Sequence, residues 1–167
     1  MKSTRLLFTL CLLALATTAL YGQEPTPVIE QPAYPIFGQE QADFIAAMHP
    51  ILFDFNDHVI DAPGEEKAID HDAKWLNAHP NVHFTIEGYT DWRGSVPYNM
   101  LLAQRRADAA KNALVAAGVS PDRISFSVGW GKLTQVCSEA DDACYAKNRR
   151  VHLVYDPTPG SGAAAGQ

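Results

Sequence analysis

The sequence predicts one α/β domain over residues 40–156, with a mixed four-stranded sheet and helices packed on it. Short apolar segments rich in β-branched and aromatic residues alternate with longer segments whose apolar residues recur at every third or fourth position. Glycine and proline separate these segments. Their order is strand, helix, strand, helix, strand, strand. We therefore expect right-handed crossovers between parallel neighbouring strands, and a last strand that closes the sheet antiparallel.

The first half of the domain contains a strand, a helix and a second strand. Segment 51–55 is short and apolar, as in a buried strand. The following helix is expected to begin near Pro63, with acidic residues in its first turn, and to end before Pro80. Its apolar stripe consists of Ala68, Ile69, Ala73, Trp75 and Leu76. Segment 82–89 alternates apolar and polar residues and is the second strand.

The second half contains a long helix and two more strands. The helix covers about 97–117 and is expected to stop at Gly118. Its core stripe consists of Met100, Ala103, Ala107, Ala110 and Leu114. Segments 124–128 and 151–155 are the third and fourth strands, joined by a loop.

Both ends of the chain differ in composition from the domain. Residues 1–22 place Lys2 and Arg5 before an apolar run and small residues after it, the layout of a secretory signal peptide. The run is shorter than the roughly 17–25 residues of a spanning helix, with an uncleaved anchor as the alternative. Residues 23–39 form a proline-rich linker, and residues 157–167 a tail that we expect to be disordered.

Cysteine usage agrees with export. Cys11 lies inside the apolar run, and its lipidation is disfavoured because Leu10 stands where a small residue is expected. Cys137 and Cys144 remain, and an even count in an oxidising compartment favours a disulfide between them. A metal-binding pair is the alternative, but no second Cys or His pair stands at ligand spacing.

Composition and motifs argue against several classes of function. The formal net charge of −6 disfavours nucleic acid and anionic membrane surfaces as partners. Most histidines fall in separate predicted elements, and Pro80 breaks any helical face shared by His79 and His83. We therefore expect no metal site and no cofactor. The chain also lacks HExxH, GxSxG and paired glycosidase carboxylates, so no enzyme is expected.

Segment 87–95, EGYTDWRGS, is the first candidate for a functional site. It begins at the end of the second strand and places Thr90, Asp91 and Arg93 between two glycines. A turn at this point needs the glycines, but it does not need two opposite charges beside a tryptophan.

The first turns of the long helix face this segment. At about 100° per residue, Arg105 points away from the core stripe, whereas Asn99, Leu102 and Arg106 share the flank nearest Asp91. A carboxylate, a guanidinium, an amide and an apolar floor then form a concave patch that suits a zwitterion. The spacing supports equally well an alternative in which Asp91 and Arg106 pair with each other and brace the loop.

Five segments together resemble the OmpA-like domain family, and the match is closest to the branch containing the peptidoglycan-associated lipoprotein. They are FDFN (53–56), EGYTDWRG (87–94), YNMLLAQRRA (98–107), GVSPDRIS (118–125) and KNRRV (147–151). The resemblance implies a βαβαββ two-layer sandwich. It also implies non-covalent binding of peptidoglycan through the diaminopimelate residue of its stem peptide. The implied location is the periplasm of a Gram-negative-type envelope, in association with the cell wall or outer membrane.

The resemblance also implies which residues contact the ligand. By position, the ligand-binding set is Phe55, Asn56, Thr90, Asp91, Arg93, Asn99, Leu102 and Arg106. Asp91 and Arg106 match the principal contacts, and Asn99 matches the asparagine that orders the loop. Arg149 and Arg150 match paired arginines before the last strand, which we expect to be structural or peripheral.

Two positions depart from the family pattern. Tyr89 replaces the usual histidine, and Asn56 stands where aspartate is common in this branch, which removes one negative charge.

A periplasmic protein-interaction module of the Tol-Pal type, with weak or no wall binding, is the main alternative to wall binding. A peptidoglycan hydrolase is the enzymatic one and is disfavoured by the missing motifs.

Overall fold

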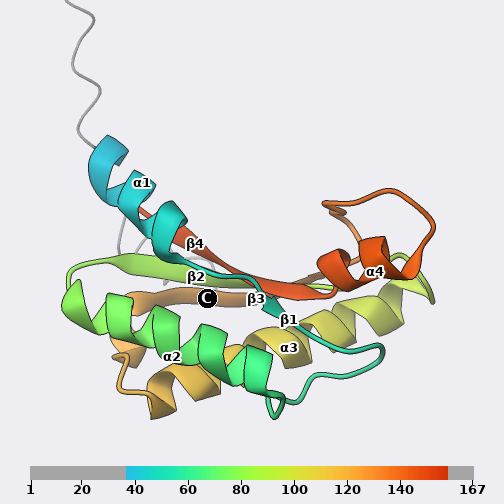
Figure 1. Cartoon of the computed structure of the whole chain (residues 1–167), viewed down its shortest axis with the longest axis horizontal. Helices are drawn as coiled ribbons and strands as arrows, with labels where there is room; N and C mark the ends of the chain where they lie inside the picture. Colours follow the sequence, from blue (N-terminus) through green and yellow to red (C-terminus); the bar gives the residue numbers. More distant parts are fainter. Residues whose placement is uncertain (1–36, 158–167) are drawn as a thin grey trace, which may run out of the picture. The chain divides into compact units, whose positions relative to one another are not determined.

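Four strands form one mixed sheet in the order β1-β4-β2-β3 (Figure 1). This computed structural model describes residues 37–157, so the expectations for residues 1–22, for most of the linker and for most of the tail lie outside the described residues. The strands are β1 (Ile51–Leu52), β2 (His83–Tyr89), β3 (Ile124–Gly131) and β4 (Arg150–Asp156). The predicted mixed four-stranded sheet is confirmed.

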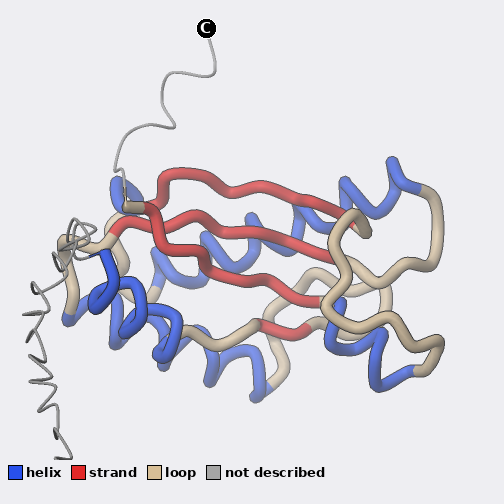
Figure 2. Tube along the Cα trace, turned by 90° about the horizontal axis from the view of Figure 1, so that it is seen from above, coloured by secondary structure: helices blue, strands red, loops and turns tan. Residues whose placement is uncertain are grey.

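Only part of the predicted strand pairing is correct. β2 and β3 are parallel neighbours as expected, but β4 lies antiparallel between β1 and β2 and separates them (Figure 2). On β4, Val151 lies opposite Ile51 and Leu153 lies opposite Ile86. All four side chains are buried, so the central position gives this apolar strand a hydrogen-bonded partner on each edge and a covered face.

Helices α2 (Pro63–Ala78) and α3 (Val96–Ala116) cover one face of the sheet (Figure 1). Their bounds agree with the sequence expectation to within a residue or two at each end. The core between the layers contains Ile69, Ala73, Leu76, Phe84, Ile86, Ala107, Ala110, Leu114, Val151 and Leu153. Ala68 and Trp75 pack against it while partly exposed, and Met100 is half-buried. None of the helices within 37–157 combines the length and apolar character needed to cross a membrane.

Two shorter helices were not expected from the sequence. Helix α1 (Phe37–Ala47) begins inside the range expected as linker, and its Phe44 is fully buried against the core. Helix α4 (Asp142–Asn148) lies in the segment expected as a loop, where Asp141 accepts a hydrogen bond from the Cys144 backbone N–H at 2.8 Å. The predicted disulfide between Cys137 and Cys144 is confirmed and joins this helix to the preceding segment.

Helix α3 lies against the sheet at a separation that only glycine permits on the strands beneath it. A Cβ atom at Gly88 of β2 would lie 2.0 Å from the Ala103 carbonyl oxygen, and one at Gly129 of β3 would lie 2.2 Å from the Gln104 backbone nitrogen. Both contacts are with backbone atoms, which cannot rotate away. The helix therefore has to move outward to admit any side chain at these positions.

We predict that Gly88→Ala lowers the free energy of unfolding by about 1–3 kcal/mol or more, because overpacking displaces α3 from the sheet. The measurement is urea denaturation followed by circular dichroism. Gly64→Ala is the matched control, since nothing lies within 4 Å of its added Cβ on α2. Equal stabilities for the two variants would contradict the close contact between α3 and β2.

Candidate functional site

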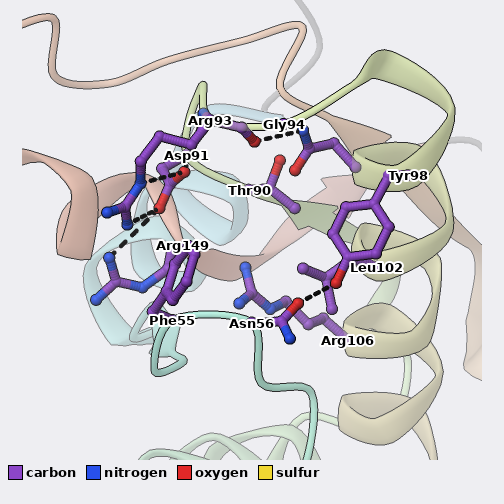
Figure 3. A pocket seen from close by; sticks show the side chains of 11 residues that line it. Phe55, Asn56, Thr90, Asp91, Arg93, Gly94, Tyr98, Leu102, Arg106 and Arg149 are labelled. Carbon is purple, nitrogen blue, oxygen red and sulfur yellow. Dashed lines mark hydrogen bonds and ion pairs between the residues drawn. The ribbon is translucent and has the colours of Figure 1, made fainter.

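A cavity of about 100 Å³ opens among the turn after β1, the segment after β2 and the first turns of α3 (Figure 3). It is lined by Phe55, Asn56, Thr90, Asp91, Arg93, Gly94, Tyr98, Asn99, Leu102, Arg106 and Arg149. Every residue of the predicted ligand-binding set is among these. The tertiary structure thus brings together side chains from three separate segments of the sequence.

Asp91 is almost fully buried and is held by two arginines. Its Oδ1 accepts from the Arg93 backbone N–H at 3.1 Å and from Arg93 Nε at 3.2 Å. Its Oδ2 accepts from Arg93 Nη2 at 2.6 Å and lies 3.5 Å from Arg149 Nη1. Burial alone would raise the pKa of Asp91, but the hydrogen bonds and charge of Arg93 and the charge of Arg149 outweigh it. The pKa of Asp91 is therefore below its ordinary value, and the carboxylate is ionised at neutral pH.

Arg93 is fixed by aromatic contacts as well as by Asp91. Its guanidinium carbon lies 4.2 Å from the centroid of the Phe55 ring and 4.5 Å from that of Tyr145. A guanidinium stacked on aromatic faces keeps its hydrogen-bonding edge free. Phe55 is otherwise largely exposed, so it forms an outer wall of the cavity.

Arg106 is completely buried and donates to backbone carbonyls on two segments. Its Nε donates to Asp57 O at 2.7 Å, its Nη2 to Asp54 O at 3.0 Å and its Nη1 to Tyr89 O at 2.9 Å. Burial, followed by repulsion from Arg149, lowers the pKa of Arg106 to about 10, which leaves it charged at neutral pH. The sequence placed this side chain only at the edge of the core.

Asp91 and Arg106 do not pair with each other among the described residues. Asp91 forms its ion pairs with Arg93 and Arg149, and Arg106 forms its hydrogen bonds with carbonyl oxygens. The alternative in which these two charges pair with each other to brace the loop is therefore wrong for this structure. Figure 3 shows the Arg106 side chain extending from α3 into the cavity that Asp91 also lines.

The segment between β2 and α3 is ordered by Asn99. Its Nδ2 donates to Arg93 O at 2.8 Å and to Ser95 O at 3.0 Å. Gly94 has a φ of +89°, a backbone conformation that residues other than glycine and asparagine rarely adopt. The segment thus holds Asp91 in place through contacts that do not involve its charge.

Tyr98 is a cavity residue that the sequence analysis missed. Its hydroxyl donates to Asn56 Oδ1, across the cavity from α3 to the turn after β1. Asn56 has a φ of +62° in that turn, a conformation that asparagine tolerates better than most residues. The helical spacing carried a signal, because Tyr98 precedes Leu102 by four residues and therefore shares its face of α3.

Thr90 places a buried hydroxyl without a hydrogen-bond partner at the cavity. The residue is 2% exposed, and its Oγ1 bonds to none of the described groups. Such a group usually finds a partner inside a folded protein, and a ligand can supply it. Beside it, Leu102 gives the cavity an apolar floor.

The two arginines at the start of β4 differ in their relation to the cavity: Arg149 directly precedes the strand, and Arg150 is its first residue. Arg149 lines the cavity, and its Nε also donates to Phe53 O at 2.8 Å. Arg150 does not line it, and its guanidinium carbon lies 4.0 Å from the centroid of the Tyr89 ring. The Tyr89 hydroxyl donates to Glu87 at 2.6 Å, and the residue is absent from the cavity lining. The departure from the family pattern at Tyr89 therefore lies outside the cavity.

The ionised groups of the cavity carry a net charge of +2, because Arg93, Arg106 and Arg149 face one carboxylate, Asp91. No histidine is among the lining residues. The cavity is therefore suited to a ligand that brings at least one carboxylate, together with a cation that Asp91 can accept.

Comparisons with known proteins agree on one family. The profile of the OmpA family matches residues 52–149. The chain is 38% identical over 119 residues to the peptidoglycan-associated lipoprotein of Pasteurella multocida, covering 71% of this chain and 77% of that protein. It is 37% identical over 119 residues to the protein of the same name from Haemophilus influenzae, covering 71% and 76%.

Two solved structures show the same fold. The peptidoglycan-associated lipoprotein from Burkholderia pseudomallei is 35% identical with a TM-score of 0.61, and the match covers 66% of this chain and 92% of that chain. The C-terminal domain of Helicobacter pylori MotB is 24% identical with a TM-score of 0.57, and the match covers 66% and 86%. The second likeness concerns the fold alone.

We predict that Arg106→Lys lowers the free energy of unfolding by about 2–4 kcal/mol. A lysine ammonium cannot reach all three carbonyls that the planar guanidinium reaches from fixed directions, so hydrogen bonds around a fully buried charged group are lost. Denaturant unfolding measures the effect. Arg105→Lys is the control on the exposed side of α3 and is expected to stay within about 0.5 kcal/mol of the wild type. Wild-type stability for Arg106→Lys would show that these carbonyl bonds are dispensable.

Proposed function

The chain belongs to the OmpA family, and from this premise we propose that its cavity binds peptidoglycan non-covalently through the diaminopimelate residue of the stem peptide. This binding would link the cell wall to the envelope. Relatives that are 35–38% identical carry the name peptidoglycan-associated lipoprotein, which supports the ligand class and the periplasmic, wall-associated location. The observation that carries the proposal is that Asp91 and Arg106 line one cavity without pairing with each other.

Both charged groups keep hydrogen-bonding capacity for a ligand. Arg106 uses three of its five N–H groups on backbone carbonyls, so two remain for a ligand carboxylate. Asp91 Oδ2 accepts one short bond, from Arg93, and has a lone pair for an ammonium. The free end of diaminopimelate carries this pair of groups, an ammonium and a carboxylate on one carbon.

The excess of guanidinium groups favours diaminopimelate over lysine in the stem peptide. Lysine offers an ammonium at its end but no second carboxylate. Its binding would leave the remaining Arg106 N–H groups and the Thr90 hydroxyl without partners in a desolvated site. The preference for diaminopimelate therefore arises from unpaired polar groups in the complex with lysine, and not from a larger contact area.

The cavity is built for binding and not for catalysis. Its one carboxylate has a lowered pKa and is held by Arg93, so it is a poor general acid or base. Thr90 is hydrogen-bonded to no base that could activate its hydroxyl. We therefore assign the protein a non-enzymatic function that needs no cofactor.

We predict that Asp91→Asn weakens binding of a diaminopimelate muropeptide at least tenfold, because the ammonium loses its counter-charge. Isothermal titration calorimetry of the purified mature protein measures the affinity. Arg105→Ala serves as the matched control and is expected to bind as the wild type does. A lysine-type muropeptide is expected to bind less tightly to the wild type.

Two results would contradict the proposed binding site. Wild-type affinity for Asp91→Asn, with native circular dichroism, would remove Asp91 from the site. Absence of heat, together with failure to cosediment with intact wall, would overturn wall binding and favour the protein-interaction function.

We predict that the affinity for the diaminopimelate muropeptide changes little between about pH 5 and pH 7.5. The pKa of Asp91 is lowered from its ordinary value of 3.8, so the ionised form persists throughout this range and is lost only as the pH falls through the lowered pKa. No histidine lines the cavity to add a transition near neutrality. Calorimetric titrations across this range test the prediction. A drop in affinity between pH 7 and pH 6 would implicate a different titrating group.

A further inference from the structure

We propose that His49, His71 and Asp72 form a second site, which binds a divalent transition-metal ion, with Zn²⁺ as the best-suited cation. His49 lies in the connection between α1 and β1, and the other two residues lie on α2. None of the three lines the cavity described above. The proposal does not depend on the wall-binding function.

The three side chains converge on one carboxylate oxygen. His49 Nδ1 lies 3.3 Å from Asp72 Oδ1, and His71 Nδ1 lies 3.4 Å from the same atom. The two imidazole rings meet edge to face, with centroids 4.4 Å apart. One ligand atom from each residue lies within 4.8 Å of the other two.

The two separations from Asp72 Oδ1 match the geometry of a tetrahedral metal site. Zn²⁺ binds imidazole nitrogen and carboxylate oxygen at about 2.0–2.2 Å, so two ligands at tetrahedral angles are about 3.3–3.6 Å apart. Both distances from Asp72 Oδ1 are close to this range before any ion is present. A cation would replace the direct contacts between the ring nitrogens and the carboxylate, with small adjustments of the side chains.

The charge of the cluster also calls for a cation. Asp72 is completely buried, and within residues 37–157 no lysine or arginine forms an ion pair with it. Its Oδ1 lies beside the two imidazole nitrogens, and its two oxygens accept from the His49 backbone N–H at 3.2 and 3.3 Å. A buried carboxylate is costly without a positive partner, and a divalent ion would supply one. The backbone bond orients the carboxylate, as outer hydrogen bonds do in metal sites.

A metal ion can reach the cluster from solvent. The His49 and His71 side chains are 53% and 54% exposed, on the wall of an open surface hollow. Gly64 and Lys67 of α2 also line the hollow. No atom lies within 4 Å of a Cβ added at Gly64, so this side of the hollow is open to solvent, whereas Lys67 brings a like charge that would weaken the site.

A second group with similar spacing does not compete for the ion. Cys137, Glu139 and Cys144 also lie within ligand distance of one another. Both of these sulfur atoms are joined in the disulfide, so no thiolate is present to bind a metal. Of the two groups found within residues 37–157, the imidazole and carboxylate cluster is therefore the one that offers free ligand atoms.

The proposal predicts that Zn²⁺ binds the purified mature protein saturably and with a stoichiometry of one. The experiment uses protein without a polyhistidine tag, which would itself bind Zn²⁺, and keeps the disulfide oxidised. His71→Ala and, separately, His49→Ala are expected to weaken binding at least tenfold in calorimetric titration. His58→Ala is the matched control, because His58 is half-buried outside the cluster, and it is expected to bind as the wild type does.

Two further readouts separate a built site from loose surface binding. Co²⁺ in place of Zn²⁺ is expected to show the visible absorption bands of tetrahedral coordination, and these should disappear in His71→Ala. Zn²⁺ should raise the melting temperature of the wild type but not of His71→Ala, because an ion that binds only the folded state stabilises it. Absence of saturable binding, or equal affinity in His71→Ala and wild type, would overturn the proposal.

Discussion

The guanidinium of Arg106 connects three parts of the chain through backbone hydrogen bonds: helix α3, the turn after β1 and the end of β2. Asp54 O and Asp57 O accept from it on one side, and Tyr89 O accepts on the other. The two carbonyls in the turn lie outside any strand ladder; Asp54 O also accepts from the Asp57 backbone N–H at 3.2 Å, so the Arg106 guanidinium adds a second donor there. The same side chain lines the cavity. The distance between the turn after β1 and the end of β2, which form two sides of the cavity, therefore depends on the residue that we propose contacts the ligand.

A second buried arginine donates to three backbone carbonyls at the opposite end of the sheet. Arg123, also buried, donates to Leu76 O, Val82 O and His79 O, each at 2.8 Å. These bonds satisfy carbonyls at the C-terminal end of α2 and tie that end to the start of β2. Two buried arginines therefore join helices to strands at both ends of the sheet, while the glycines under α3 set the distance between the layers.

The cavity is organised before any ligand is present. Asp91 is held in one orientation by Arg93, Arg93 is stacked on Phe55 and Tyr145, and Asn99 fixes the backbone between them. Little side-chain entropy is then lost when a ligand binds, which favours affinity from a small contact area. The cost of the arrangement is that three guanidinium groups line a cavity with a single carboxylate, an imbalance that a ligand carboxylate would relieve.

The sequence by itself determined the order of the principal elements, the family, the disulfide and eight of the residues that line the cavity, but not Tyr98. These follow from local patterns: apolar periodicity for α2, α3 and the strands, and motifs such as EGYTDWRG that keep their residues together in the chain. It did not determine the place of β4, since strand pairing depends on which buried faces meet. Nor did it reveal the partners of Asp91 and Arg106, because their nearest acceptors and donors include Asp54, Asp57 and Arg149, all distant in the chain. The meeting of His49 with His71 and Asp72 likewise depends on the packing of α2 beside the connection from α1 to β1, because His49 lies 23 residues before Asp72 and no local pattern relates them.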